Sequence, residues 1–132
     1  MLIHYISASV ARPFDAVVAE MIDRLRSENF EVLSQIDLAA TVRGHAGAPN
    51  KGYRVLGACH RQLAREALDV RSTLGILLPC HVIVRETDDE FVEITSVDPI
   101  AAIDRSGNSA LVRIALEVQR CLRRAVEGME SG

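Results

Sequence analysis

Two Cys-His pairs are the residues of this chain best suited to carry chemistry. Cys59 and His60 end the segment VLGACH, and Cys80 and His81 lie within the apolar stretch GILLPCHVIV. Two thiolates can hold a soft metal or interconvert with a disulfide, and either use needs a lowered thiol pKa or a nearby cation such as His60, Arg61 or His81. The two cysteines therefore define the candidate site.

A four-ligand metal cluster built from these pairs is not expected. Successive residues of a strand point to opposite faces, so Cys80 and His81 cannot both reach one ion while the strand is regular. The chain also lacks the C-x-x-C spacing of structural zinc sites and of thioredoxin-like motifs. Because free cysteine is often a buried small hydrophobe, core packing stays open as an alternative for Cys59 and Cys80.

Other polar residues are assigned more ordinary roles. Asp37 and Asp98 each precede a helix-like turn, so their carboxylates are expected to act as N-caps, and each could also lie at a pocket rim. Cys121 is expected to pack on the last helix. No phosphate-binding glycine loop, dinucleotide fingerprint, nucleophile elbow or H-E-x-x-H motif occurs, so the large cofactor classes are not supported and the cofactor stays unknown.

Composition places the chain among ordinary folded domains. Its 132 residues are 48% hydrophobic and 25% charged, which predicts a single domain over 1–132 with a core of its own. A net charge of −3 and 4% aromatic residues argue against nucleic-acid binding. The start lacks a signal peptide and no apolar run could span a membrane, so we expect a cytoplasmic protein with reduced thiols.

The elements that must position the site follow from periodicity and breakers. Apolar residues recur at helical spacing over 13–27 and over 109–127. The segments expected to form strands are 2–9, 30–37, 53–58, 77–86 and 90–97, the last two as a hairpin, and shorter helices are expected at 38–42 and 61–70. The glycine-rich residues 44–52 read as a loop that could cover a site.

The order β-α-β-β-α-β-β-α predicts an α+β two-layer sandwich, with an antiparallel-rich sheet and helices on one face. If Cys59 closes the third strand and Cys80 opens the fourth, both lie at one edge of the sheet. A two-thiol site is then possible.

The chain resembles the domain of unknown function 302 family. The resemblance rests on IDL at 36–38, YRVLGAC at 53–59, LAREAL at 63–68, GILLPCHVIVRE at 75–86 and VDP at 97–99, in that order. It implies a TBP-like sandwich, found in bacteria and archaea and often as a homodimer, with no established reaction. The family pattern falls on Asp37, Cys59, Pro79, Cys80 and Asp98, which the resemblance therefore indicates as the pocket.

The chain departs from the family pattern beside each cysteine. The family more often has asparagine after both cysteines, and a proline after the first asparagine, where this chain has His60, Arg61 and His81. The departure argues against a role that needs an asparagine amide and favours one in which imidazole tunes a thiol.

Three functions remain open on the sequence. The first is a homodimeric binding module for a small molecule or soft metal, with a ligand pocket formed by Asp37, Cys59, His60, Cys80 and Asp98. The second is a thiol-dependent redox or sulfur-transfer enzyme, with Cys80 as nucleophile and Cys59 as resolving thiol. The third is a structural dimer with both cysteines in the core.

Overall fold

The computed structural model describes residues 5–42, 51–73, 80–102 and 108–131. These residues fold into a five-stranded sheet and five α-helices. The strands are β1 (Tyr5–Val10), β2 (Phe30–Asp37), β3 (Tyr53–His60), β4 (Cys80–Glu86) and β5 (Val92–Val97). The helices are α1 (Phe14–Ser27), α2 (Leu38–Val42), α3 (Arg61–Val70), α4 (Pro99–Ala102) and α5 (Ser109–Glu127), and a 3-10 turn follows at Gly128–Ser131.

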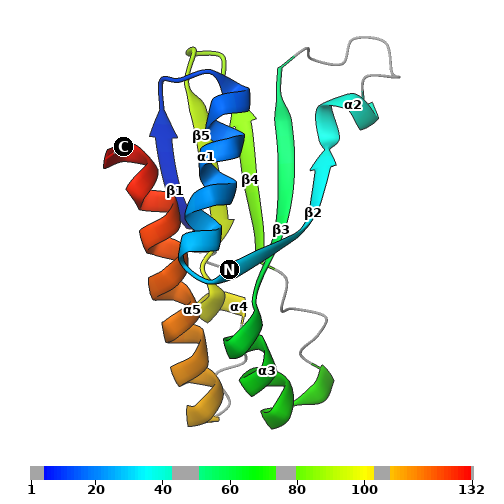
Figure 1. The fold of residues 1–132 in the computed structure, drawn as a ribbon, viewed down its shortest axis with the longest axis vertical. Coiled ribbons are helices and arrows are strands. Elements are labelled where there is room, and N and C mark those ends of the chain that lie inside the picture. The colour runs from blue at the N-terminus through cyan, green and yellow to red at the C-terminus, as the bar shows by residue number, and fades with distance from the viewer. Residues whose placement is uncertain (1–4, 43–50, 74–79, 103–107, 132) are drawn as a thin grey trace.

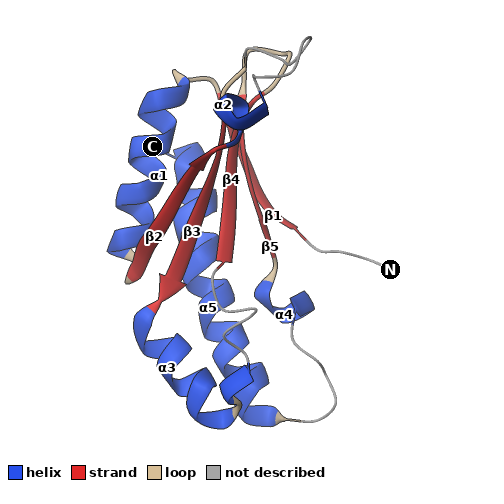
Figure 2. Cartoon of the chain, turned by 90° about the vertical axis from the view of Figure 1, so that its right-hand side faces the viewer, coloured by secondary structure: helices blue, strands red, loops and turns tan. Residues whose placement is uncertain are grey.

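The strands lie in the order β1-β5-β4-β3-β2, and every neighbouring pair is antiparallel (Figure 1). Helices α1 and α5 cover one face of this sheet, and α3 lies beyond its end (Figure 2). The predicted order of elements and the α+β two-layer sandwich are therefore confirmed.

The core lies between the sheet and these two helices because alternate strand residues face inward. In β1 the buried residues are Ile6, Ala8 and Val10, and the residues between them are exposed. Helix α1 contributes apolar residues at helical spacing, namely Val17, Val18, Met21 and Leu25, all buried. One apolar stripe per element is enough to bury the inner face.

A second, smaller apolar cluster holds α3 in place. Leu63 and Ala67 of α3 pack against Leu111 and Ile114 of α5, and Val118 touches both clusters. Helix α5 has 19 residues and so is about 28 Å long. Its N-terminal half extends past the sheet and gives α3 a surface on which to pack (Figure 1).

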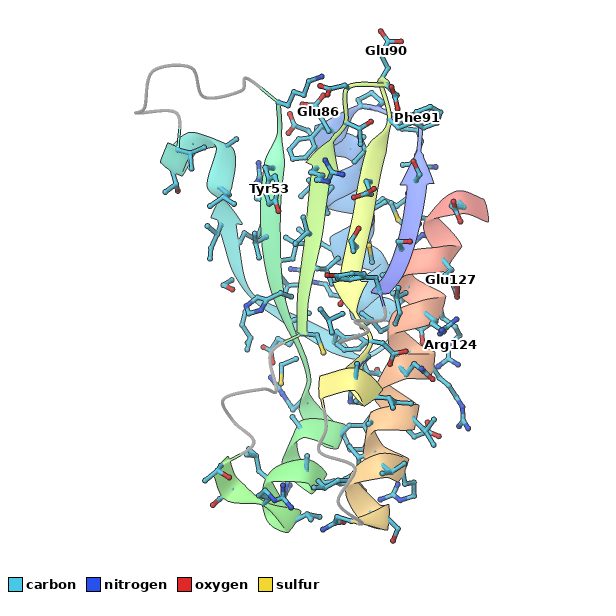
Figure 3. The ribbon with its side chains drawn as sticks, turned by 180° about the vertical axis from the view of Figure 1, so that it is seen from behind. Tyr53, Glu86, Glu90, Phe91, Arg124 and Glu127 are labelled. Atoms are coloured by element: carbon cyan, nitrogen blue, oxygen red, sulfur yellow. The ribbon has the colours of Figure 1, made fainter. Side chains whose placement is uncertain are left out.

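The β4–β5 hairpin forms as predicted, with a turn at 87–91. The Thr87 amide donates to the Phe91 carbonyl at 2.8 Å, and Glu90 takes a left-handed conformation with φ 64°. This turn lies at the end of the sheet opposite α3 (Figure 3). Among the helices within the described ranges, none is long and apolar enough to cross a membrane.

Candidate functional site

The strand register brings the two candidate thiols to one end of the sheet. Cys80 opens β4 opposite Ala58, the residue before Cys59 on β3. On the other side of β3, Cys59 pairs with Glu31 of the edge strand β2. The expected neighbourhood of Cys59 and Cys80 therefore exists.

The two thiols nevertheless lie on different faces of the sheet. Cys80 shares its parity with the buried Val82 and Val84, so it faces the helical layer. Cys59 lies between the buried Ala58 and His60 and faces the open side. His81 is exposed, on the face opposite Cys80, as strand geometry predicts.

Both thiols have raised pKa values. Burial raises the pKa of Cys80 to about 11, and a charge on Cys59 would raise it further. Burial also raises the pKa of Cys59, with a second contribution from the Glu31 carboxylate. Both groups are thus protonated at neutral pH, whereas a thiol nucleophile has to be a thiolate.

The structure gives His60 a local structural role. His60 is 9% exposed, and its Nδ1 accepts a hydrogen bond of 3.2 Å from the Leu63 amide, so it is the N-cap of α3. Its ring meets Phe30 edge-on, with centroids 5.5 Å apart. The asparagine of the family pattern could supply the same cap, since its side-chain oxygen also accepts such a bond.

Asp98 lies at the same end of the sheet as Cys80. The β4–β5 register ends with Val82 opposite Ser96, and each candidate residue is two positions further on. Asp98 is 8% exposed; its Oδ1 accepts from the Ile100 amide at 3.0 Å, and its Oδ2 from Gln119 Nε2 at 2.8 Å. Its carboxylate caps α4 and ties it to α5.

Asp37 lies at the other end of the sheet, which corrects the predicted grouping. It pairs with Arg54, five residues before Cys59 on β3, so the two lie about 17 Å apart along the strand. Its Oδ1 accepts from the Ala40 amide at 2.9 Å, which makes it a helix cap. Asp37 and Asp98 each come at the end of a predicted strand, so the sequence alone does not tell at which end of the sheet each of them lies.

Most of the predicted covering loop, 44–52, lies outside the residues that the structure describes. Residues 43–50 and 74–79, and with them Pro79, lie outside the described residues. The described residues that flank the first segment, Val42 and Lys51, line a hollow of about 440 Å³ at the Asp37 end.

A hollow of about 390 Å³ opens beside Cys59, and we call it the Cys59 hollow. Its apolar wall consists of Leu33, Ala64 and Leu68, of which Leu33 is 60% exposed. The β2–β3 register shifts between Val32 and Ser34, so Leu33 belongs to a β-bulge. Bulges re-aim side chains and are frequent beside binding sites.

A second hollow of about 580 Å³ opens beside His60, and we call it the His60 hollow. The two hollows share three charged residues, Glu31, Arg61 and Arg65. They therefore flank one group of side chains at the start of α3.

Leu33 and Arg65 were not among the site residues predicted from the sequence. The bulge at Leu33 leaves no trace in the alternation of β2, so no sequence signal predicts it. Arg61 and Arg65 are four residues apart on a helix that starts directly after Cys59 and His60, and this spacing puts them on one face. That signal could have identified Arg65.

The two cysteines belong to no cluster of metal-binding residues in the part of the chain that the structure describes. Among the residues that it describes, no three histidine, cysteine, aspartate or glutamate side chains group in a way that could hold a metal ion. Cys59 and Cys80 are two free thiols on opposite faces.

Comparison with known proteins agrees with the fold. The crystal structure of an uncharacterized conserved protein DUF302 from Bacillus stearothermophilus is similar, with a TM-score of 0.84 and 20% identity over 93% of this chain and 95% of that chain. No curated protein matches the chain. The family model described as Domain of unknown function DUF302 matches residues 6–129, and the chain therefore belongs to that family.

Proposed function

We propose that the protein is a homodimeric small-molecule binding module whose ligand occupies the Cys59 hollow. The observation that carries this proposal is the composition of that hollow. Its volume of about 390 Å³ suits a small organic ligand, and it combines an apolar wall with charged groups of both signs, Arg61 and Arg65 beside Glu31 and Asp69. A ligand that covers the exposed side chains of Leu33 and Leu68 would remove apolar surface from water, which favours binding.

The soft-metal and enzyme alternatives receive less support. The enzyme requires a thiolate in the free protein at neutral pH, and burial raises the pKa of both Cys59 and Cys80. A metal centre would need further ligands, and among the described residues no three histidine, cysteine, aspartate or glutamate side chains group in a way that could hold a metal ion. The resolving role also requires the two sulfurs to meet, although they face opposite sides of the sheet. Cys59 in the proposed module is a neutral, polarisable part of the pocket wall.

The ligand site is tested by filling the hollow. Ala64→Trp places an indole in the Cys59 hollow, and Ala19→Trp on the exposed side of α1 is the matched control. Ligand-observed NMR with a set of small aliphatic and aromatic acids should detect binding to wild type and to the control but not to Ala64→Trp. Equal binding to all three proteins, or to none, would contradict the proposal.

The homodimer part of the proposal relies on the uncovered face of the sheet. Apolar side chains there include Tyr5 at 57% exposure, Val97 at 44% and Ile36 at 47%, and Tyr53 lies on the same face (Figure 3). Five strands about 4.8 Å apart, with six or more residues each, give a face of roughly 500 Å² in projection. This projected area is of the same order as the roughly 800 Å² of surface that each partner buries in a stable interface.

Dimerisation is tested at the centre of this face. Ile83 pairs with Val55 and Thr95 in the middle row of the sheet. We expect Ile83→Lys to convert a dimer into a monomer in light scattering at micromolar concentration, because the lysine charge would be buried between two sheets. Leu116→Lys, on the exposed side of α5, should leave the mass unchanged. A monomeric wild type would exclude the dimer.

A further inference from the structure

We propose that the His60 hollow binds a phosphate-class oxyanion, which would be the charged group of the module's ligand. Three arginines, Arg26, Arg61 and Arg65, line this hollow together with a single carboxylate, Glu31. The chain as a whole carries a net charge of −3, so this local excess of positive charge runs against its overall balance. Guanidinium groups present forked donors that match the oxygens of phosphate.

Two of these arginines are available to a ligand. Within the described part of the chain, neither Arg26 nor Arg65 forms an ion pair, and Arg61 pairs with Glu31 at 2.6 Å. The Arg61 and Glu31 side chains are 80% and 50% exposed, so their pair is screened by water and can be exchanged for a ligand contact.

His60 supplies a donor whose direction is already fixed. A neutral imidazole that accepts at Nδ1 carries its proton on Nε2, and the cap bond from the Leu63 amide occupies Nδ1. The edge contact with Phe30 fixes the ring as well. Nε2 has no hydrogen-bond partner among the described residues, although the side chain is more than nine-tenths buried and lines the hollow.

The start of α3 adds backbone donors to the same hollow. His60 satisfies the Leu63 amide, but the amides of Arg61 and Gln62 in the first turn have no acceptor within the helix. Both residues line the hollow. The positive end of the ten-residue helix dipole therefore reinforces the arginines.

The ligand class follows from the position of the two hollows. Since they share Arg61 and Arg65, one molecule can place an oxyanion in the His60 hollow and an apolar body against Leu33 and Leu68. This assignment of the ligand as an amphipathic organic phosphate rests on the proposed function, whereas the oxyanion site itself does not.

The oxyanion site is tested with inorganic phosphate. Titration against chloride at constant ionic strength, followed by amide NMR, should give saturable shifts at Arg61 and Gln62. Arg65→Gln should weaken phosphate about tenfold, and the control Arg123→Gln, on α5 beside Glu127, should bind as wild type does. His60→Asn keeps an N-cap and removes the Nε2 donor, so it should fold normally and also bind phosphate more weakly.

The outcomes separate this inference from the proposed function. Shifts that do not saturate, or an equal loss of affinity in Arg65→Gln and Arg123→Gln, would overturn the oxyanion site. If phosphate binds as expected and Ala64→Trp has no effect on organic acids, the proposed ligand site in the Cys59 hollow fails and the oxyanion site stands. If the organic acids bind wild type but not Ala64→Trp, and phosphate does not bind, the oxyanion site fails and the proposed ligand site stands.

Discussion

At the scale of single residues, the two cysteines differ by their environment and not by their neighbours in sequence. Each is followed by histidine, yet Cys80 is directed into the helical layer and Cys59 into an open hollow. Strand parity alone produces this difference, because Cys80 pairs with Ala58 and not with Cys59.

The accessibility of the hollow predicts the order of thiol modification. In the folded protein we expect Cys59 to react with iodoacetamide first, and Cys80 and the buried Cys121 much more slowly, because the reagent needs access as well as thiolate. Peptide mass spectrometry at pH 8 would report the order. Preferential modification of Cys80 would instead support the enzyme hypothesis, in which Cys80 is the nucleophile.

The raised pKa of Cys80 predicts a loss of stability at high pH. The ordinary thiol pKa is 9.0 and the folded value is about 11, so the unfolded chain ionises first as the pH rises. The stabilisation is fully present below pH 9 and is lost between pH 9 and about 11, by about 1–3 kcal/mol. The free energy of unfolding, measured with urea at a series of pH values, should fall more steeply with pH for wild type than for Cys80→Ser, and only in this window. An identical pH dependence of the two proteins would contradict the burial of the thiol.

At the scale of elements, the same capping chemistry serves two unequal purposes. Asp37 caps the exposed five-residue α2 with one bond. Asp98 is buried, caps α4 and accepts a second bond from Gln119 of α5. The sequence identifies both caps from an aspartate before a short helix, but burial and the Gln119 contact come from the packing of α5.

This inequality predicts different costs for the same mutation. Asp98→Ala should lower the free energy of unfolding by about 2–3 kcal/mol, because it also leaves the Gln119 amide without its partner. Asp37→Ala, the matched control, should cost about 0.5–1 kcal/mol, as an exposed cap does. Chemical denaturation measures both values, and equal costs would show that the Gln119 bond contributes nothing.

At the scale of the whole molecule, the candidate site depends on the small cluster between α3 and α5. The main core contains no residue of α3, whereas this helix forms part of the wall of both hollows. Four apolar residues therefore hold the site against the sandwich: Leu63, Ala67, Leu111 and Ile114.

We expect this cluster to open separately from the main core. Leu63→Ala should cost about 2–3 kcal/mol and accelerate hydrogen exchange mainly in α3, while Leu122→Ala in the main core should accelerate exchange in all elements. Site-resolved exchange by NMR distinguishes the two patterns. A uniform increase in Leu63→Ala would show that α3 and the sandwich unfold as one unit.

Much of the fold could be predicted from local sequence. The stripes of α1 and α5, the alternation of β1 and the turn at 87–91 are all local patterns, and one apolar face per element leaves a two-layer sandwich as the natural arrangement. Cys59, Cys80 and Asp98 could be grouped from local sequence as well. Each lies at the end of a predicted strand, and these strands follow one another along the chain.

What only the tertiary structure decided depends on contacts between elements distant in sequence. Register sends Asp37 to the far end of the sheet and turns Cys59 and Cys80 to opposite faces. The bulge at Leu33 and the packing of α3 on α5 create the two hollows. The sequence by itself determined which elements form and which residue types could do chemistry. The pairing and packing of whole elements set the distances between these residues. For this reason the candidate site is a hollow lined by arginines and not the predicted pair of thiols.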